Sequence, residues 1–207
     1  MSYVRSGHDL PAPMETETPY YALLEFDCPD PGTEDLALQR FEFCVEVGSV
    51  LDGVVSQSEA QAADLWRYRE GISEAITKYT PYKNDLSVRI SKVPAYLRDL
   101  DELAQSRYPD FEVLWYGHFG DGNLHMNILK PTDMPVEEFE KVCGRVNPDV
   151  FELTREHHGS ISAEHGIGLL KQSYLSYSRS EQDIERMRGI KAVFDPANIL
   201  NPGKLLG

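Results

Sequence analysis

The segment around residues 121–122, an Asp-Gly pair, constrains the fold more than any other part of this chain. Residues 117–127 read Gly-His-Phe-Gly-Asp-Gly-Asn-Leu-His-Met-Asn, and Asp-Gly between strand-forming residues is a strong signal for a β-hairpin. A two-residue turn at this pair places His118 opposite His125. Side chains that face each other on one side of a sheet have Cβ atoms about 4.5–5.5 Å apart. The sequence therefore predicts two neighbouring imidazoles on a rigid ribbon.

A metal site is predicted from these two imidazoles and one carboxylate. About forty residues later, residues 159–168 read Gly-Ser-Ile-Ser-Ala-Glu-His-Gly-Ile-Gly, which sets Glu164 beside His165. The glycines permit an irregular backbone that aims both side chains inward. His118, His125 and Glu164 match the two-His-one-carboxylate set of catalytic zinc, and also that of non-haem iron. The alternative is that they are ordinary polar residues in tight turns.

Strand-like and helical patterns alternate along the rest of the chain. Apolar and alternating runs predict strands at residues 20–28, 53–57, 85–91, 113–116 and 124–129. Apolar spacing predicts helices at residues 34–51, 58–78, 93–106, 135–157 and 180–194. Ser58 is placed to cap the second helix, with Gln61 completing a capping box, and Pro148 is a point at which the fourth helix could kink or break. The fold class that follows is α+β, an antiparallel sheet covered by helices.

The two polar motifs and the ending at residues 194–204, Phe-Asp-Pro-Ala-Asn-Ile-Leu-Asn-Pro-Gly-Lys, resemble the C-terminal domain of FAD-linked oxidases. This is the D-lactate, glycolate and D-2-hydroxyglutarate dehydrogenase group of the vanillyl-alcohol-oxidase-type flavoproteins. The resemblance covers nearly the whole chain and implies a ferredoxin-like arrangement with an internal duplication. We expect residues 1–19 to be a leader or boundary segment and residues 20–207 to be the domain.

The resemblance also implies an FAD cofactor, carried mainly by a separate N-terminal domain. No Gly-rich nucleotide-binding fingerprint follows a first strand in this chain. We therefore expect a fragment, an engineered truncation or a separately encoded half, inactive alone, that works with an FAD-binding domain in the same polypeptide or in a separate chain.

Substrate-binding residues are expected because 2-hydroxy carboxylates need cationic hydrogen-bonding partners. Residues 66–75 and 82–85 match the family pattern that supplies them. The resemblance implies that the anion is bound by Arg69, Ser73, Lys83 and Asn127. Arg69 and Ser73 are spaced to share one face of a helix, although Arg69 could also be an ordinary solvated arginine. Arg89 replaces the proline that is usual in the family pattern, which leaves the choice of substrate open.

Two further roles come from the resemblance. His165 is expected to be the general base that removes the hydroxyl proton, because a histidine near its unperturbed pKa suits that task at neutral pH. The alternative is that His165 is a fourth ligand or a packing residue. Asn201 is expected to approach the flavin. A divalent metal, zinc above all, would bind the substrate carboxylate and hydroxyl, and hydride would pass to the flavin to give a 2-oxo acid.

Two other classes of function stay open. A metal-dependent hydrolase would use the same two histidines and glutamate to activate water. A non-catalytic binding module would be left after loss of the flavin-binding half. A flavin domain encoded next to this chain would decide for the dehydrogenase.

Composition limits which binding partners and which cellular compartment we expect for this chain. A formal net charge of −14 disfavours nucleic acid and anionic membrane surfaces. No apolar run approaches the length of a membrane span, and the start of the chain lacks a signal peptide. The three scattered cysteines indicate reduced thiols. We expect a soluble intracellular protein, cytoplasmic or, in a eukaryote, in the mitochondrial matrix.

Overall fold

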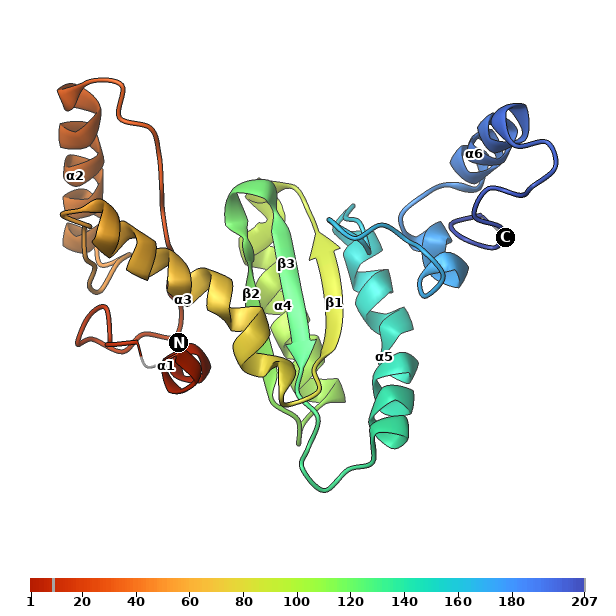
Figure 1. The fold of residues 1–207 in the computed structure, drawn as a ribbon, viewed down its shortest axis with the longest axis horizontal. Helices are drawn as coiled ribbons and strands as arrows, with labels where there is room; N and C mark the ends of the chain where they lie inside the picture. The colour runs from red at the N-terminus through yellow and green to blue at the C-terminus, as the bar shows by residue number, and fades with distance from the viewer. Residues whose placement is uncertain (9, 207) are drawn as a thin grey trace. The chain divides into compact units, whose positions relative to one another are not determined.

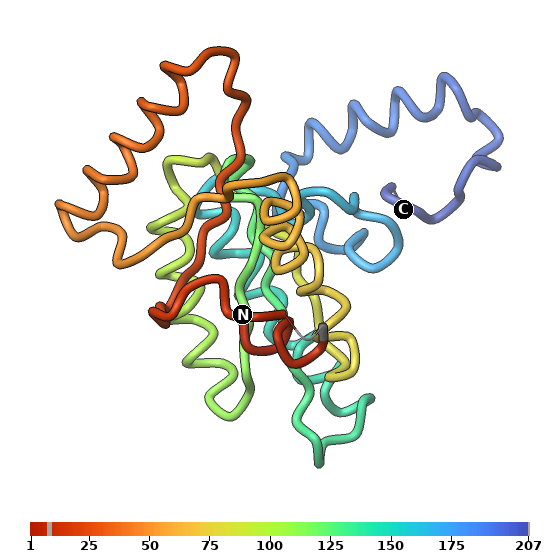
Figure 2. Tube along the Cα trace, turned by 60° about the vertical axis from the view of Figure 1, so that its left-hand side comes forward, coloured from red at the N-terminus to blue at the C-terminus, as the bar shows by residue number. Residues whose placement is uncertain are grey.

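The computed structural model of the chain describes residues 1–8 and 10–206 (Figures 1 and 2). The chain forms two compact units, residues 1–78 and residues 79–207. Each unit is built around its own cluster of buried apolar side chains.

The first unit contains three helices: α1 (Ser2–His8), α2 (Pro31–Glu46) and α3 (Glu59–Thr77). A small apolar cluster of Val4, Leu10 and Ala75 joins α1 to α3. Ser58 caps α3 as predicted, since its hydroxyl accepts the Gln61 backbone N–H at 3.2 Å. The Gln61 side chain in turn accepts the N–H of residue 57 rather than that of the cap.

Two strands predicted in the first unit are wrong. Residues 20–28 and 53–57 have no strand structure, and all of residues 20–28 are exposed. A strand needs a neighbour for its backbone hydrogen bonds and a covered face for its apolar side chains. Leu24 has 82% of its surface exposed, so within the described structure this apolar run lacks such a cover.

The second unit holds a three-stranded antiparallel sheet in the order β1-β3-β2. The strands are β1 (Tyr82–Ser87), β2 (Val113–His118) and β3 (Asn123–Ile128). The helices of this unit are α4 (Val93–Arg107), α5 (Val136–Glu156) and α6 (Glu181–Phe194), and three short 3₁₀ turns are η1 (Ile90–Lys92), η2 (Phe119–Asp121) and η3 (Gln172–Tyr177). The predicted α+β class is confirmed, and β1 begins three residues earlier than predicted.

The helices of the second unit agree closely with the predicted ranges. Pro148 lies inside α5, and the helix continues past it to Glu156. Ser180 caps α6 by accepting the Asp183 backbone N–H at 3.2 Å. Among the residues that the structure describes, no helix is long and apolar enough to cross a membrane.

The two faces of the sheet differ sharply in character. Side chains alternate between faces along a strand, and one face carries Leu86, Leu124, Met126 and Ile128. These pack with apolar side chains of α4 and α5 into the main core, and α4 lies behind the strands in Figure 1. The other face carries polar residues in register: Lys83 and Asn127, Asp85 and His125, Ser87 and Asn123. Core packing on one face therefore fixes which side chains are grouped on the other.

The predicted register of the hairpin is wrong by two residues. His118 pairs with Asn123, and His125 pairs with Tyr116. The turn has four residues instead of two, because η2 is inserted and Gly122 closes it in a left-handed conformation, φ 70°. A shift of one residue would move a strand's side chains to the other face, but a shift of two does not. His118 and His125 therefore stay on one face as diagonal neighbours.

Candidate functional site

Three predicted metal donors come together on the polar face of the sheet. His118, His125 and Glu164 each offer one ligand atom, and these atoms all lie within 4.8 Å of one another. His118 Nδ1 is 2.8 Å from Glu164 Oε1, and the two imidazole ring centroids are 5.8 Å apart. The predicted hairpin register was wrong, yet the predicted grouping of side chains is present.

The loop that carries Glu164 is fixed at the edge of the sheet. Ser87 and Ser160 form an antiparallel bridge, with backbone N–H to O distances of 3.0 and 2.8 Å. Gly159 permits this approach, because a Cβ there would lie 2.4 Å from the Ser87 carbonyl oxygen. Beyond the bridge, Gly166 and Gly168 adopt positive φ values, as the irregular backbone that we predicted requires.

Asp85 ties this loop to β1. Its Oδ2 accepts the backbone N–H groups of Glu164 and His165 at 2.9 and 3.2 Å. Its Oδ1 lies 3.4 Å from His125 Nδ1, which is long for a hydrogen bond. Burial opposes ionisation of Asp85, but the His125 side chain and the two backbone amides hold the pKa of its carboxyl well below the ordinary value. Asp85 is therefore a carboxylate at neutral pH.

The three donors differ in their surroundings. The side chains of His118 and Glu164 are each 44% exposed, whereas that of His125 is 13% exposed. The His125 ring packs against the Tyr116 ring, with centroids 4.9 Å apart. The Asn123 side-chain amide donates to Glu164 Oε1. His125 is thus the donor that the sheet shields, and His118 and Glu164 are the exposed ones.

His165 occupies an exposed position next to Glu164. A second group of possible donors, Asp85, Glu164 and His165, also lies within 4.8 Å. The structure therefore places His165 beside the donor set, and both the predicted role as a base and the alternative role as a ligand stay predictions.

The predicted substrate-binding residues fall into two groups. Lys83 and Asn127 are opposite each other on the polar face, one pair along from Asp85 and His125. The Asn127 amide donates to the His125 carbonyl at 3.3 Å, and its Oδ1 has no hydrogen bond among the described residues. Arg69 and Ser73 lie one turn apart on α3, in the first unit.

Asn201 lies in an exposed turn after α6 that Asp195 organises. The Asp195 carboxylate accepts the backbone N–H groups of Ile199 and Leu200 at 2.8 and 3.0 Å. The Lys191 ammonium, together with these amides, holds the pKa of the Asp195 carboxyl below its usual value. Asn201 itself has a positive φ of 48°. Its predicted approach to a flavin stays a prediction.

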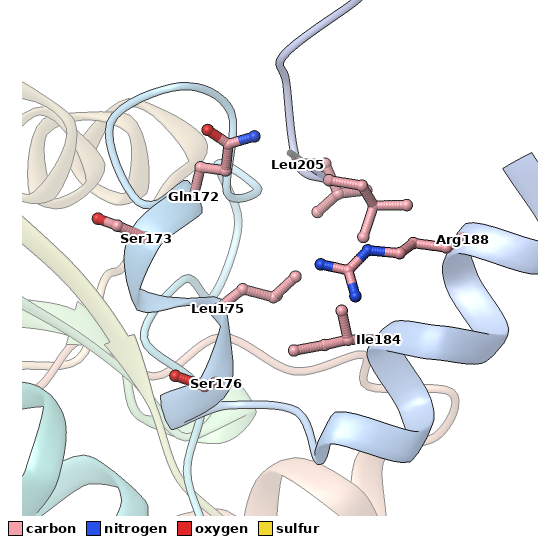
Figure 3. Close-up of a pocket in the computed structure, with 8 residues that line it drawn as sticks. Gln172, Ser173, Leu175, Ser176, Ile184, Arg188 and Leu205 are labelled. Atoms are coloured by element: carbon pink, nitrogen blue, oxygen red, sulfur yellow. The ribbon is translucent and has the colours of Figure 1, made fainter. Parts of the chain in front are cut away.

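The hollow in Figure 3 is a poor candidate for the functional site. It lies between η3, α6 and the end of the chain, and its lining includes Leu175, Ile184, Arg188 and Leu205. None of the three predicted donors lines it, and Arg188 is the one charged residue in the lining. The possible metal donors His118, His125 and Glu164 are grouped on the polar face of the sheet instead.

Sequence reasoning missed Asp85 as a site residue. Its position two residues after Lys83 was the available signal, because side chains two apart on a strand share a face. Its place opposite His125 required the pairing of β1 with β3, which no local pattern specifies.

Comparison with known proteins adds a family and several relatives. A family model described as FAD linked oxidases, C-terminal domain, matches residues 2–205. D-2-hydroxyglutarate dehydrogenase of Stutzerimonas stutzeri (strain A1501) is 56% identical over 197 residues, which are 95% of this chain and 42% of that protein. The Xanthomonas citri pv. viticola protein of the same name is 53% identical over 199 residues, 96% of this chain and 42% of its own length. Mitochondrial D-2-hydroxyglutarate dehydrogenase of Arabidopsis thaliana is 40% identical over 197 residues, 94% of this chain and 34% of its length. The chain thus spans less than half of these relatives.

Proposed function

The chain belongs to the family of FAD-linked oxidase C-terminal domains, and from this premise we propose that it is the substrate- and metal-binding domain of an FAD-dependent dehydrogenase. The reaction would oxidise a D-2-hydroxy acid to the 2-oxo acid. The observation that carries the proposal is the grouping of His118, His125 and Glu164 on one polar sheet face. D-2-hydroxyglutarate is the favoured substrate, because relatives at 56% and 53% identity bear its name.

The donor set fits a divalent ion, zinc above all. Two imidazoles and one carboxylate are the ligands of catalytic zinc with an open position. Asn123 supports the carboxylate of Glu164, and Asp85 faces His125, as partners of metal ligands commonly do. When bound, the ion would polarise a substrate oxygen as a Lewis acid, and the FAD would accept the hydride.

The chain's own residues would bind and orient the substrate. Lys83 offers an ammonium for a carboxylate, and Asn127, opposite it in register, is buried with an Oδ1 that has no hydrogen bond among the described residues. The His165 imidazole would take the proton of the substrate hydroxyl, because an imidazole nitrogen can accept a proton and His165 lies next to Glu164 beside the donor set. The roles of Arg69 and Ser73 in binding the anion, and of Asn201 in approaching the flavin, rest on the resemblance.

The rest of the enzyme belongs to the proposal as well. The flavin-binding part would be joined to this domain in the same polypeptide or supplied as a separate chain, since the chain spans 42% of its Stutzerimonas relative. The ferredoxin-like arrangement with an internal duplication is also proposed from the resemblance.

A substrate panel tests the function. The protein that combines this domain with its flavin-binding part is assayed with D-2-hydroxyglutarate, D-lactate and glycolate, using a dye as electron acceptor. We expect the highest kcat/KM for D-2-hydroxyglutarate. A preference for D-lactate or glycolate would contradict the substrate, and no turnover of any 2-hydroxy acid by the FAD-loaded, zinc-loaded protein would contradict the reaction class.

A further inference from the structure

We propose that Asp85 is the positioning residue of the donor set: one buried carboxylate sets both the place of Glu164 and the tautomer of His125. This inference rests on the proposed metal site. Asp85 does not itself belong to the predicted ligands, and its two oxygens face two different parts of the site. The contact of Oδ2 positions the loop that carries Glu164, and the contact of Oδ1 sets the tautomer of His125.

The first contact fixes the loop. Two consecutive backbone N–H groups, those of Glu164 and His165, donate to the same oxygen, Asp85 Oδ2. This loop has no helix or strand of its own, and the two positive-φ glycines at 166 and 168 follow directly. Hydrogen bonds to a charged acceptor are stronger than those to a neutral one. Asp85 therefore holds the backbone of the loop at Glu164, whose side chain contacts His118 and lies within 4.8 Å of the ligand atom of His125.

The second contact sets the proton on His125. Asp85 and His125 are directly opposed in β1 and β3, with Oδ1 at 3.4 Å from Nδ1. Oδ1 is buried and has no hydrogen bond among the described residues, and a proton on His125 Nδ1 would supply its donor once the 3.4 Å gap closes by a few tenths of an ångström. A carboxylate at one ring nitrogen keeps that nitrogen protonated and leaves the lone pair on the other, Nε2. Nε2 is then the nitrogen free to bind an ion.

The surroundings of Asp85 support a fixed geometry. The Tyr116 ring packs against His125 and limits rotation of the imidazole. The Lys171 ammonium lies 3.4 Å from the Asp85 carbonyl oxygen and also contacts the Ile161 carbonyl oxygen. Lys171 thus links β1 to the same loop and sets a positive charge near the buried carboxylate.

The substitution Asp85→Asn separates this role from simple packing. Asparagine has the same shape, and its one oxygen can still accept the two loop amides. Its NH₂ group must then face His125 Nδ1, because an amide nitrogen cannot accept a backbone N–H. That arrangement favours the tautomer with a bare Nδ1 and a protonated Nε2. A protonated Nε2 has no lone pair with which to bind metal. The matched control is Asp99→Asn, because Asp99 pairs with His157 at 2.8 Å, away from the donor set.

Two measurements on the chain decide the proposal. Zinc affinity is measured by competition with a chromophoric chelator, and the His125 tautomer is read from imidazole ¹⁵N chemical shifts of the metal-free chain. We expect one zinc per chain in the wild type and an affinity about 10–100-fold lower for Asp85→Asn, with Asp99→Asn unchanged. The His125 proton should move from Nδ1 to Nε2 in Asp85→Asn alone.

The outcomes distinguish this inference from the proposed function. Equal zinc affinity and the same His125 tautomer in the wild type and Asp85→Asn would overturn the role of Asp85. A wild-type chain whose His125 proton lies on Nε2 would overturn it too, even if Asp85→Asn does not fold. A wild-type chain that binds no zinc would overturn the proposed metal site, and the role of Asp85 would then be decided by the tautomer alone.

Discussion

At the scale of single residues, neighbours in sequence have different surroundings in this site. Glu164 and His165 are adjacent and both exposed, and their backbone amides share one acceptor, but it is the Glu164 side chain that contacts His118 and Asn123. His125 is the most shielded of the three proposed ligands. Substitution of each histidine should therefore affect a different property.

Alanine substitutions at His125 and His165 separate a ligand from a base. His125→Ala removes one of the proposed metal donors, so metal and activity should be lost together. His165→Ala keeps the backbone N–H that binds Asp85, so metal should be retained while turnover falls by about 10²–10⁴-fold, as for a lost general base. Metal analysis and steady-state kinetics of the flavin-loaded protein measure both. Loss of metal from His165→Ala would identify His165 as a ligand instead.

Arg69 and Arg67 provide a matched pair on α3. Arg67 is exposed and forms an ion pair with Asp64 at 3.1 Å, whereas Arg69 is partly buried. Arg69→Ala should raise KM by about 10–100-fold with a smaller change in kcat, the size expected for one lost hydrogen bond to a charged group. Arg67→Ala should leave both constants nearly unchanged. Equal effects of the two substitutions would show that Arg69 has no special role with substrate.

At the scale of elements, the turn of the hairpin positions the donor set. Gly122 has a positive φ, and a Cβ there would lie 1.9 Å from the Val88 carbonyl oxygen. The Gly122 carbonyl oxygen also accepts the Val88 backbone N–H at 3.0 Å. The turn therefore packs closely against the backbone that follows β1, and its conformation depends on the absence of a side chain at this position.

Alanine substitutions at two glycines of the turn test this packing. Gly122→Ala should lower the free energy of unfolding by about 1–3 kcal/mol for the left-handed backbone alone, and more for the contact with Val88. It should also weaken zinc binding, because His118 and Asn123 flank the turn. Gly120→Ala is the control, since nothing lies within 4 Å of a Cβ at Gly120. Denaturant titrations of both variants give the comparison, and equal stability would contradict the close packing.

Local patterns predicted the elements whose signals lie within a few residues. Ser58 and Ser180 cap the helices that follow them, and an apolar spacing of three and four residues marks α4 and α5 well. Residues 20–28 have a strand-like composition without a partner strand in the described structure, and composition alone cannot supply one. The donor set was predictable because side-chain alternation survives an error of two residues in register. The part played by Asp85 was not predictable from local patterns, since it depends on pairing between strands that are distant in sequence.

At the scale of the whole molecule, this chain supplies part of the proposed enzyme. It spans 42% of its Stutzerimonas relative, and in the proposal the remaining part would hold the hydride acceptor. Apolar side chains at the end of α6 and in the turn after it are strongly exposed, with 78% of the surface of Phe194 and 74% of that of Ile199 accessible.

The 207-residue chain alone should bind zinc but should not oxidise 2-hydroxy acids. The reason is that the roles proposed for its residues are to bind, orient and deprotonate a substrate, and none of these side chains accepts a hydride. Dye reduction with D-2-hydroxyglutarate, before and after addition of the flavin-binding part, measures this. Dye reduction by the chain alone, without flavin, would contradict the proposal that the flavin-binding part supplies the hydride acceptor.

The distances along the chain between the site residues have a consequence for the order of folding. His118 and His125 belong to one hairpin. Contacts between residues so close in sequence form early in folding. Glu164 meets His118 across 46 positions, and its amide meets Asp85 across 79, so the carboxylate joins only after a large loop has closed. Full-strength zinc binding should therefore appear late in refolding, and the metal would serve as a reporter of completed long-range structure.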